Sequence, residues 1–212
     1  MLEVISKSND GGDDPKPQGG LPPGAENLLD LGKASPASTL ELVRIGFDAV
    51  PVIPFTPAMV PAHVHYLNDD EIRGFVHCNG EGCLLCAAGR KMEDRKALPV
   101  YLPAERRIGI LLMSTSMRPG ALLPQMLEHV SESVKNRARV VLFISKKDNF
   151  SFNIAAAPIR PDSDDGAAAI AQFMENWGAG RINPLSAIQT ITPEQAKHVP
   201  SIARVLALKG GF

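Results

Sequence analysis

Three cysteines, and the histidines just before them, are the residues of this sequence best suited to chemistry. The cysteines Cys78, Cys83 and Cys86 fall within nine residues. An odd number of cysteines packed so closely is unsuited to a disulfide framework, whereas a C-x-x-C pair brings two thiolates to one ion. Soft thiolates together with an imidazole favour tetrahedral zinc at a closed structural site. The sequence therefore predicts a Zn²⁺ site that still needs one ligand.

A histidine upstream of Cys78 is expected to complete this site. Neighbouring residues of a strand point to opposite faces, which disfavours His77 because it directly precedes Cys78. His63 and His65 share one face of the preceding predicted strand, and the turn after Asn68 folds that strand back beside Cys78. The residues alone leave His63 and His65 open.

Short apolar runs separated by turn residues fill the middle of the chain and predict a mainly β domain over 39–160. The runs expected to be strands are 40–47, 50–55, 60–67, 72–77, 97–102, 108–113, 138–145 and 149–157. Pro51 and Pro54 predict that the second of these is an edge or distorted strand. A helix is expected near 124–135. Many short strands with one inserted helix favour a small barrel of the oligonucleotide/oligosaccharide-binding (OB) type.

The two ends of the chain differ from this β-rich middle. Residues 1–38 are crowded with Gly, Pro, Asp and Ser, and they carry too little apolar surface to offset their conformational entropy. They are predicted to form a disordered, acidic arm. Residues 161–212 are predicted to be a helical appendage. Within it, Thr192 and Gln195 form a capping-box pattern, and the helix that follows is expected to reach Leu208.

Charge is distributed unevenly along the chain. The formal net charge is −1, yet residues 1–72 hold 4 basic and 11 acidic side chains, and residues 90–148 hold 12 basic and 6 acidic ones. A basic segment suits a partner that carries phosphates, and aromatic side chains could stack on its bases. The residues predicted to contact nucleic acid are Tyr66, Arg90, Lys91, Arg95, Lys96, Tyr101, Arg106, Arg107, Lys146, Lys147 and Phe150.

The order of these motifs resembles the zinc-containing single-stranded-DNA-binding proteins of tailed phages, the helix-destabilising type. In that family a histidine lies thirteen residues before the first cysteine, which is the interval from His65 to Cys78, and a C-x-x-C pair follows, as Cys83 and Cys86 do. The resemblance covers about residues 40–158. It implies an OB-fold, zinc held by these four residues, and work in phage or prophage replication or recombination. The family's loop between the first two cysteines is often longer, and its acidic carboxy-terminal tail has no counterpart in 161–212.

The sequence thus predicts sequence-tolerant binding of single-stranded DNA rather than an enzyme. It contains no G-x-x-x-x-G-K-[ST], G-x-G-x-x-G, G-x-S-x-G or H-E-x-x-H motif. Three thiolates make zinc a poor Lewis acid, which disfavours a metal-dependent hydrolase. The alternative is a zinc-stabilised protein–protein interaction module of a replication or recombination complex, which the near-neutral charge and the scarce aromatic residues favour. Clustered cysteines predict a reducing cytoplasm, and no apolar run is long enough to span a membrane. The resemblance implies that this is the cytoplasm of a bacterial or phage-infected cell.

Overall fold

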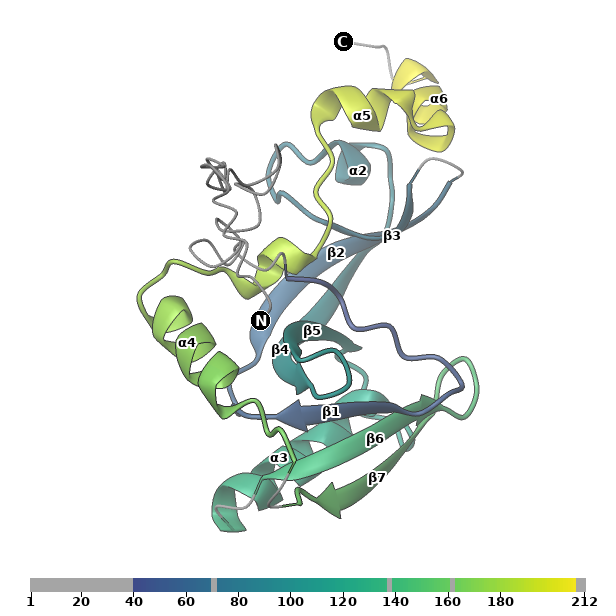
Figure 1. Ribbon diagram of the computed structural model, residues 1–212. Coiled ribbons are helices and arrows are strands. Elements are labelled where there is room, and N and C mark those ends of the chain that lie inside the picture. The colour runs from purple at the N-terminus through teal and green to yellow at the C-terminus, as the bar shows by residue number, and fades with distance from the viewer. Residues whose placement is uncertain (1–39, 70–71, 137–138, 161–162, 209–212) are drawn as a thin grey trace, which may run out of the picture. The chain divides into compact units, whose positions relative to one another are not determined.

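An antiparallel sheet of seven strands forms the centre of the described structure (Figure 1). The structure is a computed structural model that describes residues 40–69, 72–136, 139–160 and 163–208. The strands pair in the order β3-β2-β4-β1-β6-β7, and β5 pairs with β4. Their bounds are β1 Val50–Pro54, β2 Val60–Asn68, β3 Arg73–His77, β4 Met92–Leu102, β5 Arg107–Ser114, β6 Val140–Lys146 and β7 Phe152–Pro158.

The mainly β fold predicted from the sequence is confirmed, but the sheet is not a closed barrel. A barrel requires every strand to have a partner strand on both sides. Among the described strands, β3 pairs only with β2, β7 only with β6 and β5 only with β4. The predicted segment 40–47 forms no strand of its own, although Leu42 makes a parallel bridge to Ile110 of β5. The sheet is therefore open. The predicted arm 1–38 lies outside the described residues.

Strand β1 joins the two halves of the sheet although it contains two prolines. Its first residues, Val50 to Val52, pair with β6, whereas Ile53 and Pro54 pair with β4. Each half of the strand therefore has one side without a partner, where the amide that a proline lacks is not needed. The strand can thus lie between β4 and β6, in the middle of the strand order, although it contains two prolines.

The largest hydrophobic core lies between the sheet and helix α3 (Leu122–Asn136), close to the predicted helix 124–135. Leu122, Met126 and Val130 follow one another at intervals of four, so they form one apolar stripe on the helix. This stripe packs against strand residues such as Leu142 and Ile144, both of which are fully buried. The packing holds β6 and β7 to the rest of the sheet.

The C-terminal part is helical, as predicted, but its last helix is divided in two. The Thr192 hydroxyl accepts a hydrogen bond from the Gln195 N–H at 3.2 Å, and the Gln195 side chain accepts one from the Thr192 N–H at 2.8 Å, which confirms the predicted capping box. Because Pro200 has no N–H with which to continue the first helix, a second helix begins there. None of the described helices is long and apolar enough to cross a membrane. The elements are α4 Ala167–Gly178, the 3₁₀ helix η1 Pro184–Ala187, α5 Pro193–His198 and α6 Pro200–Leu208.

Candidate metal centre and aromatic surface

Four side chains converge where strand β2 meets the loop that follows β3. His65 lies on β2, Cys78 follows β3, Cys83 is the N-cap of the short helix α2 (Leu84–Ala87), and Cys86 lies within that helix. One ligand atom from each of the four lies within 4.8 Å of the other three. The structure thus brings together the four residues that were predicted from the sequence to bind a metal ion.

The spacing of these atoms fits four ligands around one tetrahedral ion. Bonds of about 2.3 Å from zinc to sulfur and about 2.0–2.1 Å to nitrogen place two sulfurs about 3.8 Å apart and a sulfur and a nitrogen about 3.6 Å apart. In the structure the sulfurs of Cys78 and Cys86 are 3.6 Å apart, and His65 Nε2 lies 3.5 Å from Cys83 Sγ and 3.4 Å from Cys86 Sγ. A disulfide would need about 2.05 Å between sulfurs. The donor set is therefore suited to zinc.

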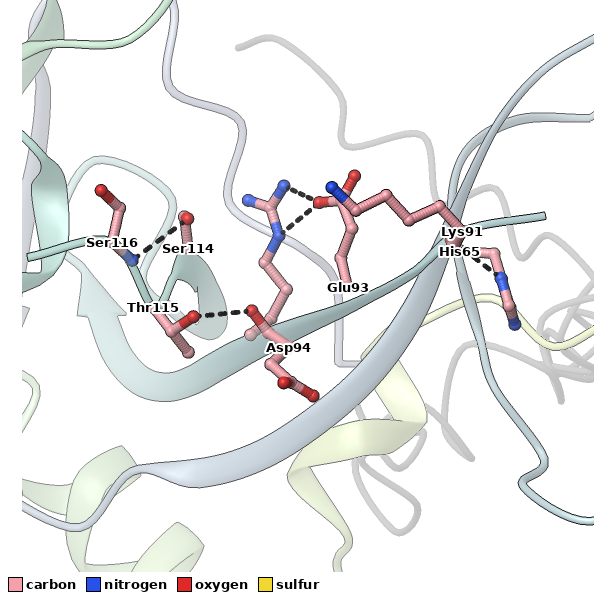
Figure 2. A network of polar contacts seen from close by, with 8 residues as sticks. His65, Lys91, Glu93, Asp94, Ser114, Thr115 and Ser116 are labelled. Atoms are coloured by element: carbon pink, nitrogen blue, oxygen red, sulfur yellow. Dashed lines mark hydrogen bonds and ion pairs between the residues drawn. The ribbon is translucent and has the colours of Figure 1, made fainter. Parts of the chain in front are cut away.

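A hydrogen bond on the far side of the imidazole orients His65. The side chain is 0% exposed, and its Nδ1 lies 3.1 Å from the carbonyl oxygen of Lys91 (Figure 2). A carbonyl can only accept, so Nδ1 carries the proton and donates it, which leaves the lone pair of Nε2 directed at the sulfurs. Histidines that bind metals are commonly held by such a second contact.

Without a cation, the thiols of Cys83 and Cys86 do not ionise equally readily. Burial raises the pKa of the Cys83 thiol, but backbone N–H groups of Cys86, Asn79 and Leu85 donate to its sulfur and hold that pKa below its ordinary value. Burial of the Cys86 sulfur, with the neighbouring sulfurs of Cys78 and Cys83, raises the pKa of Cys86 to about 12. A divalent ion would supply the positive charge that lets all three cysteines become thiolates.

The backbone of the cysteine loop is shaped for this convergence. Gly80 and Gly82 have φ angles of 72° and 81°, in the left-handed region that glycine adopts without strain. The Cys83 N–H donates to the Gly80 carbonyl at 3.1 Å, and the Cys78 N–H donates to the carbonyl of His63 at 2.8 Å. These bonds close the loop and fasten it to β2, beside His65.

Neither of the other two candidate histidines joins the cluster. The side chain of His63 is 58% exposed, and its Nδ1 lies 2.7 Å from a carboxylate oxygen of Asp94. His77 ends β3, and its N–H donates to the carbonyl of Gln189 at 2.8 Å. The structure therefore resolves the alternatives in favour of His65.

The chain matches no protein-family model, and no curated protein or solved structure is significantly similar to it. The likeness to phage single-stranded-DNA-binding proteins therefore rests on the spacing of His65 and the cysteines.

Part of the predicted basic surface is neutralised by nearby carboxylates. Arg90, Lys91, Lys96, Lys146 and Lys147 form no ion pair within the described part of the chain, and of these Lys91 and Lys147 are exposed. Three predicted arginines do form ion pairs, at 2.5 to 3.8 Å: Arg95 with Glu93, Arg107 with Glu105 and Glu41, and Arg106 with Asp164.

Tyr101 is a core residue rather than a stacking residue. It is 2% exposed, and its ring packs in a cluster with Ile53 and Phe173. Its hydroxyl donates to Asp164 at 2.9 Å. No face of the ring is open to a base, so the structure corrects the prediction that Tyr101 contacts nucleic acid. A tyrosine can place its hydroxyl in water or on a buried partner, and the sequence does not distinguish the two.

Tyr66 lies in an aromatic cluster at the edge of the sheet. It is 48% exposed, and it is the cross-strand partner of Phe75, with ring centroids 5.3 Å apart in an edge-to-face arrangement. The guanidinium of Arg95 lies 4.4 Å from the centroid of the Phe75 ring. Tyr66 thus keeps an exposed ring, as a stacking residue requires, while the nearby Arg95 lies over Phe75 and is paired with Glu93.

Phe150 stands out from the turn between β6 and β7. It is 67% exposed, and the guanidinium of Arg118 lies 5.0 Å from its ring centroid. Asp148 shapes the turn: its carboxylate accepts hydrogen bonds from the Ser151 hydroxyl and the N–H groups of Phe150 and Ser151, which hold its pKa below the usual value. Arg118 was not among the residues predicted to contact nucleic acid, because no motif of the sequence marks its position. A surface depression of about 600 Å³ is lined by Arg118, Pro119, Asp148, Asn149, Phe150 and Ser151.

Proposed function

We propose that this protein binds single-stranded DNA without sequence preference and carries a structural zinc ion. The observation that supports this most directly is the guanidinium of Arg118 beside the exposed ring of Phe150. A base needs a flat apolar surface and the adjoining phosphate needs a cation, and an arginine–aromatic pair offers both. In a duplex the faces of the bases are stacked on one another, so a ring of this kind selects single strands.

The surroundings of Phe150 suit this role. Lys146 and Lys147 lead into the turn and form no ion pair within the described ranges, so their charge is available to phosphates. An open surface depression lies beside the ring, lined by Arg118, Asn149 and Ser151 among others, so a base can reach the ring from solvent. The exposed ring of Tyr66, which packs edge-to-face on Phe75, is a second candidate for stacking on a base.

In this proposal the zinc ion has a structural role. His65, Cys78, Cys83 and Cys86 would occupy all four positions of a tetrahedral ion, which leaves none for a substrate. The ion would cross-link β2 to the cysteine loop, and no catalytic function is proposed. The motif resemblance suggests replication or recombination of a phage or prophage, in the bacterial cytoplasm, as the setting.

Fluorescence anisotropy with labelled oligo-dT at low and high salt tests the proposal. Binding at micromolar concentration or tighter is expected, with an affinity that falls as salt rises because phosphate contacts release counterions. Phe150→Ala should weaken binding about tenfold, since stacking contributes roughly 1–3 kcal/mol per base. Phe150→Trp keeps an aromatic face and should bind at least as tightly as the unchanged protein. Equal affinity of the alanine variant and the unchanged protein would contradict the assignment of Phe150.

A zinc-stabilised protein–protein interaction module is the second candidate. The observation in its favour is that carboxylates already neutralise Arg95, Arg106 and Arg107. This candidate predicts no binding of oligo-dT even at low salt, which the same titration measures.

A further inference from the structure

Phe47 is the most exposed large hydrophobic residue in the described part of the chain. It is 72% exposed, and Phe150 comes next at 67%. Phe47 lies in a bend just before β1 and belongs to none of the hydrophobic clusters that the described residues form. One exposed ring is ordinary on a protein surface, whereas two rings that flank a group of cations form a surface for a ligand.

Two backbone hydrogen bonds place Phe47 and Phe150 on opposite sides of a pair of lysines. The Lys146 N–H donates at 2.7 Å to the carbonyl of Gly46, the residue before Phe47. The Lys147 N–H donates at 3.0 Å to the carbonyl of the residue after Phe150. Successive N–H groups of a strand point to opposite sides, so one phenylalanine segment lies on each side of the lysines. The segment that leads into β1 accordingly passes beside the turn between β6 and β7 (Figure 1).

Cations outnumber carboxylates around the two rings. The charged residues of segments 44–48, 118–120 and 146–151 are Arg44, Arg118, Lys146 and Lys147 against Asp48 and Asp148. None of these four cations forms an ion pair within the residues that the structure describes. The carboxylate of Asp148 already accepts hydrogen bonds from within its own turn. Exposed rings with a surplus of positive charge suit a ligand that carries bases and phosphates.

The spacing of the two segments determines how long a strand must be to use both rings. Neighbouring strands lie about 4.8 Å apart, so the backbones next to Phe47 and Phe150 are about 10 Å apart across the lysines. Stacked bases of one strand follow one another at about 3.4 Å. Two consecutive stacked bases therefore cannot use both rings, whereas a longer strand can.

We propose that one DNA single strand crosses this end of the sheet with one base on Phe150 and another on Phe47. This path, which rests on the function proposed above, adds Phe47 as a second stacking residue. The phosphates between the two bases lie beside Lys146 and Lys147. The order of ring, cations and ring along the surface thus matches the order of base, phosphates and base along the strand.

Fluorescence anisotropy with labelled oligo-dT tests this path, with a ten-nucleotide oligo-dT and a thymidine dinucleotide as unlabelled competitors. Phe47→Ala should weaken binding of the longer competitor about tenfold, as the loss of one stacked base does. Binding of the dinucleotide should not change, because the ring of Phe150 with Arg118 beside it remains. Phe47→Trp keeps an aromatic face and should bind as tightly as the unchanged protein. A loss of dinucleotide binding in Phe47→Ala would mean that Phe47 belongs to a separate site, which contradicts the path.

Phe143→Ala is the matched control. Phe143 is 39% exposed in the middle of β6, between Pro51 and Ala155 of the neighbouring strands, so its removal should leave the affinity unchanged. Thermal melts verify that all variants are folded. A loss in Phe143→Ala as large as that in Phe47→Ala would place the strand over the face of the sheet and overturn the path. If Phe150→Ala weakens binding and Phe47→Ala does not, the path is wrong while DNA binding stands. No binding of oligo-dT by the unchanged protein at low salt would overturn both.

Discussion

Replacing His65 by alanine is expected to abolish stoichiometric zinc and to destabilise the part of the protein around the cysteine loop. Structural zinc sites bind with apparent free energies of about 10–16 kcal/mol in small peptides, and that energy is available for folding because the unfolded chain has no such site. Metal analysis of the purified variant measures the first effect, and thermal melts with and without a chelator measure the second. The unchanged protein should lose stability in chelator, whereas His65→Ala should hardly respond.

The destabilisation should extend to the C-terminal helices. Cys78 and Cys83 pack in one hydrophobic cluster with Val199 and Ile202, both 0% exposed, which belong to the end of α5 and to α6. Without the ion, the sulfurs repel one another when ionised and the cluster loses its cross-link. Hydrogen exchange in α5 and α6 should therefore accelerate in His65→Ala, while the core around Met126 stays protected.

His63→Ala is the control for this experiment. It removes the same residue type from the same strand, but the His63 side chain is exposed and its one polar contact within the described ranges is with Asp94. An exposed ion pair contributes about 0–1 kcal/mol, so zinc content and melting temperature should stay close to those of the unchanged protein. Full zinc retention in His65→Ala, with loss in His63→Ala, would show that the cluster has been assigned to the wrong histidine.

The three cysteines of the metal cluster could be predicted from the sequence because they lie close together along the chain. Cys78, Cys83 and Cys86 share one loop, so their spacing alone suggests convergence on an ion. The choice between His63 and His65 was not local. Both lie on one face of β2, and only His65 is covered, because the cysteine loop and α5–α6 close over that end of the strand. The alternation of residues along β2 does not reveal such packing between distant segments, so it could not distinguish His65 from His63.

The difference between features set within one segment and features set by contacts between distant segments also explains which parts of the fold could be predicted. Most strands, the helix α3 and the capping box at Thr192 follow from residue patterns within each segment. Closure of a barrel depends on strands far apart in sequence, and the pairing of β7 with β6 alone leaves the sheet open. The prolines of β1 predicted an edge or a distorted strand. The edge alternative is wrong because the rule assumes one partner along the whole strand, whereas β1 changes partner halfway.

Gly166→Ala is expected to lower the free energy of unfolding by about 2–5 kcal/mol, a large effect for one methyl group. Gly166 has φ 69°, and the left-handed region costs a residue with a Cβ about 1–2 kcal/mol. A Cβ at this position would also lie 2.6 Å from ring carbons of Tyr101, and such overlap in a packed core costs about 1–3 kcal/mol. Urea denaturation of the variant and the unchanged protein measures the difference.

The ring of Tyr101 cannot move aside to relieve this contact. Its hydroxyl donates to one carboxylate oxygen of Asp164 at 2.9 Å, and the other oxygen accepts the Gly166 N–H at 2.9 Å, so one side chain ties the ring to the glycine. Burial, followed by the bond to Asp164, raises the pKa of the Tyr101 hydroxyl, which keeps it protonated as a donor. The loop before α4 therefore packs closely against the Tyr101 ring and leaves no room for a side chain at Gly166.

Gly180→Ala separates the two contributions to this loss. Gly180 lies just beyond the other end of α4 and has nearly the same backbone angle, φ 70°, but a Cβ there would meet nothing within 4 Å. This variant should lose only the backbone contribution of about 1–2 kcal/mol. The excess loss in Gly166→Ala then measures how firmly Tyr101 is held in the core. Equal losses in the two variants would mean that the ring can leave its place, and Tyr101 would become a candidate for stacking on a base again.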